Sequence, residues 1–94
     1  MRLRWTPIAA DDLESIYDYL SENKPRLTQQ TMQLLFDTAR SLRRLPNRGR
    51  LGKAPGTREL VLPRLPYIIV YRVTPEIVEI VRIYHGSQDR GGAN

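Results

Sequence analysis

Cysteine is absent from this 94-residue sequence, so the chain can form neither a disulfide framework nor a thiolate zinc site. No apolar run approaches the roughly 20 residues that cross a bilayer, and residues 1–5 lack the apolar core of a signal peptide. The sequence contains no P-loop, no dinucleotide-binding glycine fingerprint, no HExxH motif and no nucleophile elbow. We therefore expect a cytoplasmic protein that needs no cofactor, holds no metal and has no membrane partner.

Two segments lack charge of one sign. Residues 40–58 contain seven Lys and Arg and no acid, whereas residues 9–23 contain five acids and no base, within a formal net charge of +5. A concentrated basic segment predicts an acidic partner, either nucleic acid or protein. The alternative is a solvated helix end and loop, whose cations suit the negative end of a helix dipole. The candidate basic patch consists of Arg43, Arg44, Arg48, Arg50, Lys53 and Arg58.

The C-terminal half is rich in β-branched and aromatic residues, in three runs separated by proline-containing turns. These runs, residues 58–62, 66–73 and 77–84, predict consecutive antiparallel strands. The middle run has one charged side chain, Arg72, so we expect it at the centre of the sheet. Near the N-terminus, Leu3 and Trp5 alternate with arginines, which predicts a short strand with one buried face.

Two amphipathic helices are predicted between the first strand and the other three. Thr6 can cap the first helix and Pro7 suits its first position, while residues 23–25 end it. Its apolar stripe is Ala9, Leu13, Ile16, Tyr17 and Leu20. The second helix is expected from Pro25 to about Leu45, with a buried face of Met32, Leu35, Phe36, Ala39 and Leu42. Residues 48–56, with three glycines and a proline, predict a loop.

The order strand, helix, helix, strand, strand, strand predicts an α+β fold. We expect a two-layer sandwich in which a helix hairpin packs on a four-stranded, mainly antiparallel sheet. Residues 1–94 then form a single domain, with residues 91–94 as a frayed tail.

Candidate chemistry gathers at the C-terminal end, in Tyr84, His85, Gln88, Asp89 and Arg90. Histidine is the residue type whose ordinary pKa lies near neutrality, so the single histidine, His85, is a candidate for proton transfer. A nucleolytic site also needs cations that hold the phosphate, so the alternative is that His85 simply ends a strand. For the acidic set, Asp11, Asp12, Glu14 and Asp18, we expect a solvated helix face rather than a metal or acid–base site.

Several stretches together resemble toxins of the RelE/ParE superfamily of type II toxin–antitoxin modules. Residues 5–7, 10–13 and 16–20 resemble the family's first helix, and residues 58–60 and 66–73 resemble its central hairpin. Residues 81–90 resemble the hydrophobic-His-Gly-x-x-Asp ending of ParE-type members. The resemblance spans nearly the whole chain, is closest to the ParE-like branch and implies the sandwich described above.

The superfamily holds two activities: RelE-type members cut mRNA on the ribosome, and ParE-type members inhibit DNA gyrase through protein contacts. The resemblance places Glu59, Val61, Ile68 and Gln88 about where the nucleases carry cations. Because a nuclease needs preorganised cations at the developing charge, we expect a ParE-like gyrase inhibitor rather than an enzyme. The expected target-binding surface is Arg82, Tyr84, His85, Gln88, Asp89 and Arg90.

Two alternatives stay open. The first is a metal-independent, ribosome-dependent mRNA endonuclease that uses His85, Tyr84, Arg58 and Arg90, and a cleft that joined Arg58, Arg82 or Arg90 to His85 would favour it. The second is a basic nucleic-acid-binding module without toxicity. The resemblance also implies a cognate antitoxin, which we expect to be acidic, partly disordered and encoded by an adjacent gene. The resemblance is also compatible with a homodimer of the toxin or a heterotetramer of toxin and antitoxin.

Overall fold

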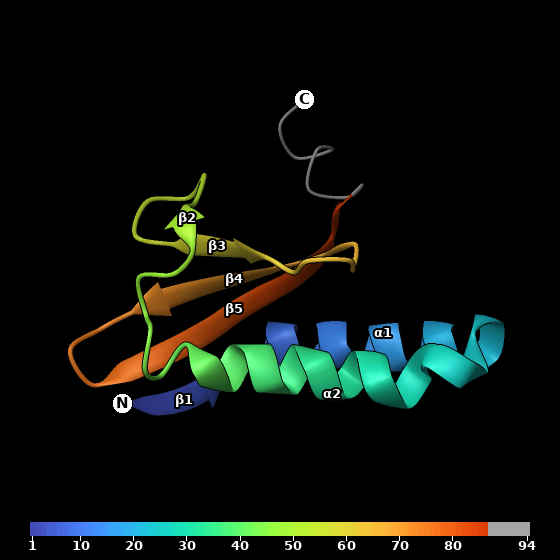
Figure 1. The fold of residues 1–94 in the computed structure, drawn as a ribbon. Coiled ribbons are helices and arrows are strands. Elements are labelled where there is room, and N and C mark those ends of the chain that lie inside the picture. Colours follow the sequence, from blue (N-terminus) through green and yellow to red (C-terminus); the bar gives the residue numbers. More distant parts are fainter. Residues whose placement is uncertain (87–94) are drawn as a thin grey trace.

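The computed structural model describes residues 1–86, and Figure 1 shows the elements in chain order. They are β1 (Arg2–Trp5), α1 (Pro7–Asn23), α2 (Pro25–Ser41), β2 (Arg50–Leu51), β3 (Arg58–Val61), β4 (Tyr67–Val73) and β5 (Ile77–His85). The predicted order is confirmed apart from β2, which lies in the segment predicted as a loop. The predicted frayed tail, residues 91–94, lies outside the described residues. No helix in the described part of the chain is long and apolar enough to span a membrane.

The sheet has five strands in the order β1-β5-β4-β3-β2, so the prediction of four strands is wrong. β1 runs parallel to β5, and the other neighbouring strands are antiparallel. β4 is the central strand, as predicted, and its Ile69 and Tyr71 are fully buried. The fifth strand is β2, where the Arg50 guanidinium donates to Glu59 Oε1 of β3 at 3.1 and 2.9 Å. Two residues are too few to show the alternation of apolar and polar side chains that predicts a strand. β2 is held instead by contacts with residues distant in the sequence.

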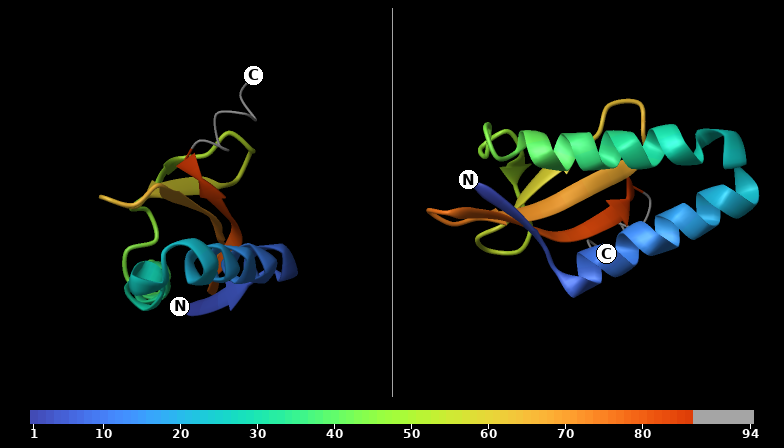
Figure 2. Two further views of the ribbon diagram at one scale, coloured as in Figure 1. Left: turned by 90° about the vertical axis from the view of Figure 1, so that its right-hand side faces the viewer. Right: turned by 90° about the horizontal axis from the view of Figure 1, so that it is seen from below.

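Both helices lie on one face of the sheet, as Figures 1 and 2 show. Side chains alternate across a strand, so Tyr67 and Ile69 of β4 join the core formed with Leu35 and Ala39 of α2. Ile68 lies between them in the sequence and points the other way. We call the two sides the helix face and the outer face. The predicted two-layer α+β arrangement is therefore confirmed.

The helix boundaries agree with the predicted signals at most positions. Thr6 caps α1, because its Oγ1 accepts a hydrogen bond from Ala9 N–H at 3.0 Å, and Pro7 occupies the first turn. Lys24 separates the helices, and its N–H donates to Leu20 O at 2.7 Å. α2 ends at Ser41, earlier than predicted, and residues 42–44 continue as a turn.

Two apolar side chains that were expected in the core are exposed instead. Tyr17 is 51% exposed and Phe36 38%. Leu45, near the predicted end of the second helix, is 58% exposed. Thr28 and Thr31 occupy buried positions of α2 that the apolar pattern did not predict. The Thr28 hydroxyl donates to Lys24 O at 3.4 Å. A threonine can lie at a helix interface when its hydroxyl bonds to the preceding turn, so hydrophobicity alone misplaced part of the buried face.

A single tyrosine fixes the segment after α2 onto the central strand. The Tyr71 hydroxyl donates to Pro46 O at 2.7 Å and accepts from Gly49 N–H at 2.8 Å. A Cβ at Gly49 would lie 2.8 Å from Glu59 O and 2.9 Å from the Tyr71 hydroxyl oxygen, so the close approach requires glycine. This contact positions β2 at the sheet edge.

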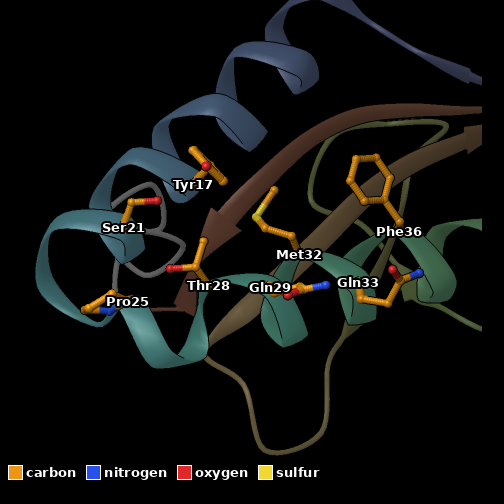
Figure 3. A pocket seen from close by; sticks show the side chains of 8 residues that line it. All are labelled: Tyr17, Ser21, Pro25, Thr28, Gln29, Met32, Gln33 and Phe36. Carbon is orange, nitrogen blue, oxygen red and sulfur yellow. The ribbon is translucent and has the colours of Figure 1, made fainter.

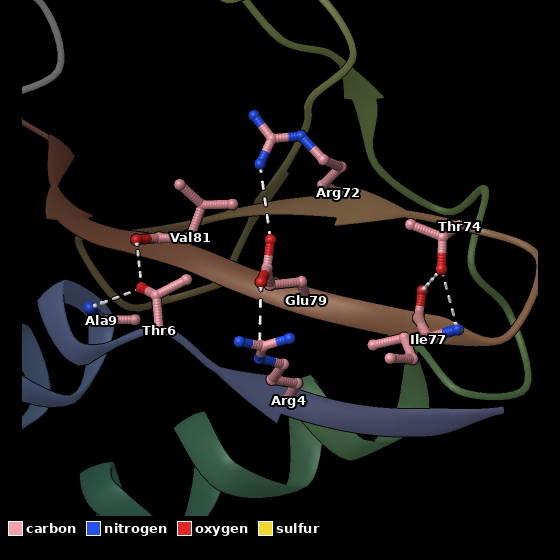
Figure 4. A network of polar contacts seen from close by, with 8 residues as sticks. All are labelled: Arg4, Thr6, Ala9, Arg72, Thr74, Ile77, Glu79 and Val81. Atoms are coloured by element: carbon pink, nitrogen blue, oxygen red, sulfur yellow. Dashed lines mark hydrogen bonds and ion pairs between the residues drawn. The ribbon is translucent and has the colours of Figure 1, made fainter.

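Figure 4 shows the polar contacts around β5 and its turn. The Glu79 carboxylate bridges Arg4 of β1 at 3.7 Å and Arg72 of β4 at 3.5 Å. Thr74 closes the predicted turn, since its Oγ1 accepts from Ile77 N–H at 3.1 Å. Exposed ion pairs contribute little to stability. This network therefore reflects the alignment of β1, β4 and β5 more than it stabilises them.

Candidate functional site

A bulge in β5 decides which face each of its last side chains occupies. Val70 pairs with Arg82, but the next residue, Tyr71, pairs with Ile80, so one residue of β5 is extra. A bulge resets the alternation of side chains along a strand. After it, Arg82 lies opposite Val70 on the outer face. Tyr84 follows two positions later on that face, whereas Ile83 points toward the helices.

The start of α1 replaces a neighbouring strand along the end of β5. β1 pairs with β5 only as far as Trp5 opposite Ile80. Beyond that point, the Thr6 hydroxyl donates to Val81 O at 3.0 Å, and Asp12 Oδ2 accepts from Ile83 N–H at 2.8 Å. Buried or half-buried backbone groups must find partners, so these two side chains complete the edge.

Asp12 also binds the guanidinium of Arg82. Arg82 Nε lies 3.0 Å from Asp12 Oδ2, and Arg82 Nη2 lies 3.2 Å from Oδ1. The hydrogen bond to Asp12 raises the pKa of Arg82, against an opposing contribution from burial. The Arg82 Cζ lies 5.0 Å from the Tyr84 ring centroid, within cation–π range. Arg82 and Tyr84, both predicted target-binding residues, therefore form one unit with Asp12.

The expectation of a solvated acidic face is wrong for Asp12, whose side chain is 15% exposed. Asp11, Glu14 and Asp18 are exposed, as predicted. Asp12 was missed because its partner lies 70 residues away in the sequence, and no local pattern signals such a pair. Within residues 1–86, no group of three or more His, Cys, Asp or Glu could hold a metal ion.

A cleft of about 570 Å³ opens between the helix hairpin and the end of the sheet. Tyr67 and His85 line it in an edge-to-face contact, with ring centroids 5.7 Å apart. Burial, with a smaller contribution from the neighbouring Tyr19, raises the pKa of Tyr67. Asp12 and Arg82 lie at the rim. Tyr67 was not among the predicted site residues.

A second hollow, of about 600 Å³, lies between α1 and α2, and Figure 3 shows its lining. Its apolar part includes the exposed rings of Tyr17 and Phe36, and Phe36 makes an edge contact with Trp5 at 5.7 Å. No charged side chain lines it. The full lining is Tyr17, Ser21, Pro25, Thr28, Gln29, Met32, Gln33 and Phe36.

Of the four residues proposed for a nuclease, the three that the structure describes, Arg58, Tyr84 and His85, do not converge. Tyr84 and His85 are adjacent in β5 and point to opposite faces. Arg58 donates to Gly49 O at 2.7 Å and so binds the loop before β2. Arg90 lies outside the described residues, as do Gln88 and Asp89. Arg82 and His85 do line one cleft, which is the arrangement stated above to favour a nuclease. The Arg82 guanidinium in that cleft is bound by Asp12.

Two rows of side chains cross the outer face where a nuclease of this superfamily would carry cations. Strand pairing places Val61, Ile68 and Tyr84 side by side in the first row. The second row is Glu59, Val70 and Arg82. Glu59 is 6% exposed and forms an ion pair with Arg50 at 2.9 Å. The first row is apolar and aromatic, and the second has each of its charges in an ion pair.

The residues of the predicted basic patch differ in their contacts. Arg50 and Arg58 hold β2 and its loop, as described above. Arg48 donates to the Ser41 hydroxyl at 2.6 Å, and the backbone N–H of Lys53 donates to Glu59 Oε2 at 3.4 Å. Arg43 and Arg44 are exposed at the end of α2. Arg48, Arg50 and Lys53 are exposed as well, and Arg58 is half-buried.

The chain is similar to known toxins over most of its length. Toxin RelE2 of Caulobacter vibrioides is 39% identical over 84 residues, which is 89% of this chain and 93% of that protein. Toxin-named protein Y4kP of Sinorhizobium fredii is 36% identical over 87 residues, covering 93% of this chain and 90% of that protein. Among solved structures, the chromosomal ParDE toxin–antitoxin system from P. aeruginosa matches with a TM-score of 0.81 and 34% identity, covering 90% of this chain and 95% of that one.

A family model described as the ParE toxin of the type II toxin–antitoxin system parDE matches residues 3–90. This match spans both helices and every strand, from β1 to the end of β5. The fold and the sequence relatives agree with it. The chain therefore belongs to the ParE toxin family of type II toxin–antitoxin systems, within the RelE/ParE superfamily.

Proposed function

We propose that this toxin inhibits DNA gyrase through protein contacts at the end of β5, without nuclease chemistry. The observation that carries the proposal is the outer face, where the expected cation positions hold Val61, Ile68 and Glu59. Arg82, the cation at this end of the sheet, is engaged by Asp12 through two hydrogen bonds. This surface offers a phosphodiester no unpaired cation among the described residues that form the two rows.

The energetic argument is that phosphodiester cleavage develops negative charge that preorganised donors must meet. Loss of a single such donor typically costs about 2.7–4 kcal/mol of transition-state stabilisation. The same face suits a protein partner, since tyrosine and arginine are enriched among the residues that dominate binding energy at interfaces. Tyr84 and Arg82 are such a pair, and we place Gln88, Asp89 and Arg90 in the same contact surface.

One observation favours a second candidate, ribosome-dependent cleavage of mRNA. Arg82, His85 and Tyr67 line one cleft of about 570 Å³, and a histidine beside a tyrosine could transfer protons. One of the similar proteins also carries the name RelE2. This candidate would require Asp12 to release Arg82 on the ribosome. It ranks second because the free chain holds that guanidinium in place.

Two assays run in parallel separate the candidates. Purified toxin is titrated into a gyrase supercoiling reaction, and the same preparation is added to ribosomes programmed with a defined mRNA. We expect inhibition of supercoiling and intact mRNA. Unchanged supercoiling at excess toxin, together with cleavage at one codon position that His85→Ala abolishes, would establish the nuclease instead.

We also infer that a cognate antitoxin neutralises the toxin. The similar P. aeruginosa structure is of a toxin–antitoxin system, and this chain leaves apolar rings and the basic α2 end exposed. We expect an acidic, partly disordered antitoxin, encoded by an adjacent gene, that covers these surfaces in the cytoplasm. Membership of a toxin family disfavours the third interpretation, a nucleic-acid-binding module without toxicity.

A further inference from the structure

We propose that Asp12 is a specificity-determining residue: by holding Arg82 within the chain, it keeps the end of β5 from binding polyanions and leaves that surface to a protein. The inference rests on the proposed function only for the identity of the protein target. Its effect on nucleic-acid binding is a property of the chain itself and can be measured without gyrase.

The geometry shows how Asp12 engages Arg82. The carboxylate takes two guanidinium hydrogen bonds, at 3.0 and 3.2 Å, and its Oδ2 also accepts the backbone N–H of Ile83 at 2.8 Å. The Tyr84 ring lies under the guanidinium at 5.0 Å. A planar guanidinium binds phosphate through the same kind of N–H groups that it offers a carboxylate. Asp12 therefore takes the Nε–H and one Nη2–H of the five donors, and its negative charge neutralises the charge that would attract a phosphate.

The surroundings would otherwise suit a nucleotide. The Arg82 side chain is 40% exposed, and it lines one cleft with the aromatic rings of Tyr67 and His85. Aromatic rings and arginine planes are the groups on which unpaired bases stack. Lys24 lines the same cleft and adds positive charge. The Asp12 carboxylate thus decides whether this surface could bind single-stranded nucleic acid or is left to a protein.

The test removes the charge and keeps the shape. Asp12→Asn retains an oxygen that can accept the Ile83 N–H but no longer neutralises Arg82. Binding of a fluorescein-labelled oligouridylate is measured by anisotropy across a salt series. We expect about tenfold tighter binding at low salt than for the wild type, since a charge-assisted contact is gained. The salt dependence should steepen by about 0.7 for the added phosphate contact.

Two variants control the measurement. Glu14→Gln removes one exposed carboxylate from the same helix and gives the same change in net charge, so it should gain little. In Asp12→Asn/Arg82→Gln the gain should disappear. The proposal is overturned if Asp12→Asn binds no more tightly than Glu14→Gln, or if the double variant keeps the gain.

An NMR measurement on wild-type toxin keeps the proposal testable even if the Asp12→Asn variant misfolds. The Nε–H resonance of Arg82 should not move when the oligouridylate is added to wild-type toxin, and a saturating shift would contradict the proposal. Wild-type toxin in the supercoiling assay separates the two ideas. If it fails to inhibit gyrase while Asp12→Asn still gains RNA affinity, the target is wrong and the role of Asp12 stands.

Discussion

Tyr71 shows how much of the fold can depend on a single hydroxyl group. Its side chain is fully buried, and its oxygen joins the central strand to Pro46 and Gly49 in the segment that leads to β2. Tyr71→Phe leaves the buried N–H of Gly49 and the half-buried carbonyl of Pro46 without this partner. We expect the free energy of unfolding to fall by about 1–3 kcal/mol, measured by urea denaturation. Tyr17→Phe, at an exposed position, should change it by less than about 0.5 kcal/mol; equal losses in both variants would contradict this account.

Tyr67 should make the free energy of unfolding fall at alkaline pH. Its pKa is raised above the usual value of 10.0, chiefly by burial, so the folded state retains the proton longer than the unfolded state does. The stabilisation is therefore present below pH 10 and is lost as the pH rises through the raised pKa. Unfolding free energies measured on both sides of that pH should show a steeper alkaline loss in the wild type than in Tyr67→Phe. Parallel curves would rule the effect out.

At the scale of elements, the junction of β1, α1 and β5 is the point that organises the site. Thr6 caps α1 through Ala9 N–H and also bonds to Val81 O of β5. Thr6→Ala should lower the free energy of unfolding by about 1–2 kcal/mol. Thr6→Ser keeps the hydroxyl and should remain close to the wild type in the same thermal and urea titrations. A loss in Thr6→Ser as large as in Thr6→Ala would show that the methyl group, not the hydroxyl, matters.

The elements that the sequence predicted are those whose own pattern carries the signal. Alternating and continuous apolar runs marked β3, β4 and β5, and Thr6-Pro7 marked the start of α1. β2 escaped because its two residues are held by Glu59 and by the Tyr71 contact, which lie elsewhere in the sequence. The candidate site was predicted in part. Arg82, Tyr84 and His85 remain predicted contact residues, and the faces they occupy depend on a bulge and on Asp12, which only tertiary packing reveals.

At the scale of the whole molecule, charge is segregated between the helices. Exposed acids lie along α1, whereas the exposed Arg43 and Arg44 follow the end of α2, in a chain of net charge +5. An acidic antitoxin should therefore be steered to the α2 end. Such steering raises the association rate and weakens with salt.

Arg44→Glu tests this steering. We expect its association rate with the antitoxin to fall by about tenfold at low salt, and the difference to shrink at high salt, as measured by surface plasmon resonance. Arg26→Glu makes the same charge change near the start of α2 and should have the smaller effect. If both variants lose the same factor, net charge rather than the α2 end guides association.

The most direct measurement of the central claim is a gyrase supercoiling reaction titrated with wild-type toxin and, beside it, with Tyr84→Ala. Arg82 and Tyr84 form the aromatic and cationic unit that we assign to target contact. The account predicts that the wild type stops supercoiling and that Tyr84→Ala needs about tenfold or more protein for the same inhibition. Supercoiling that proceeds unchanged at excess wild-type toxin would contradict it.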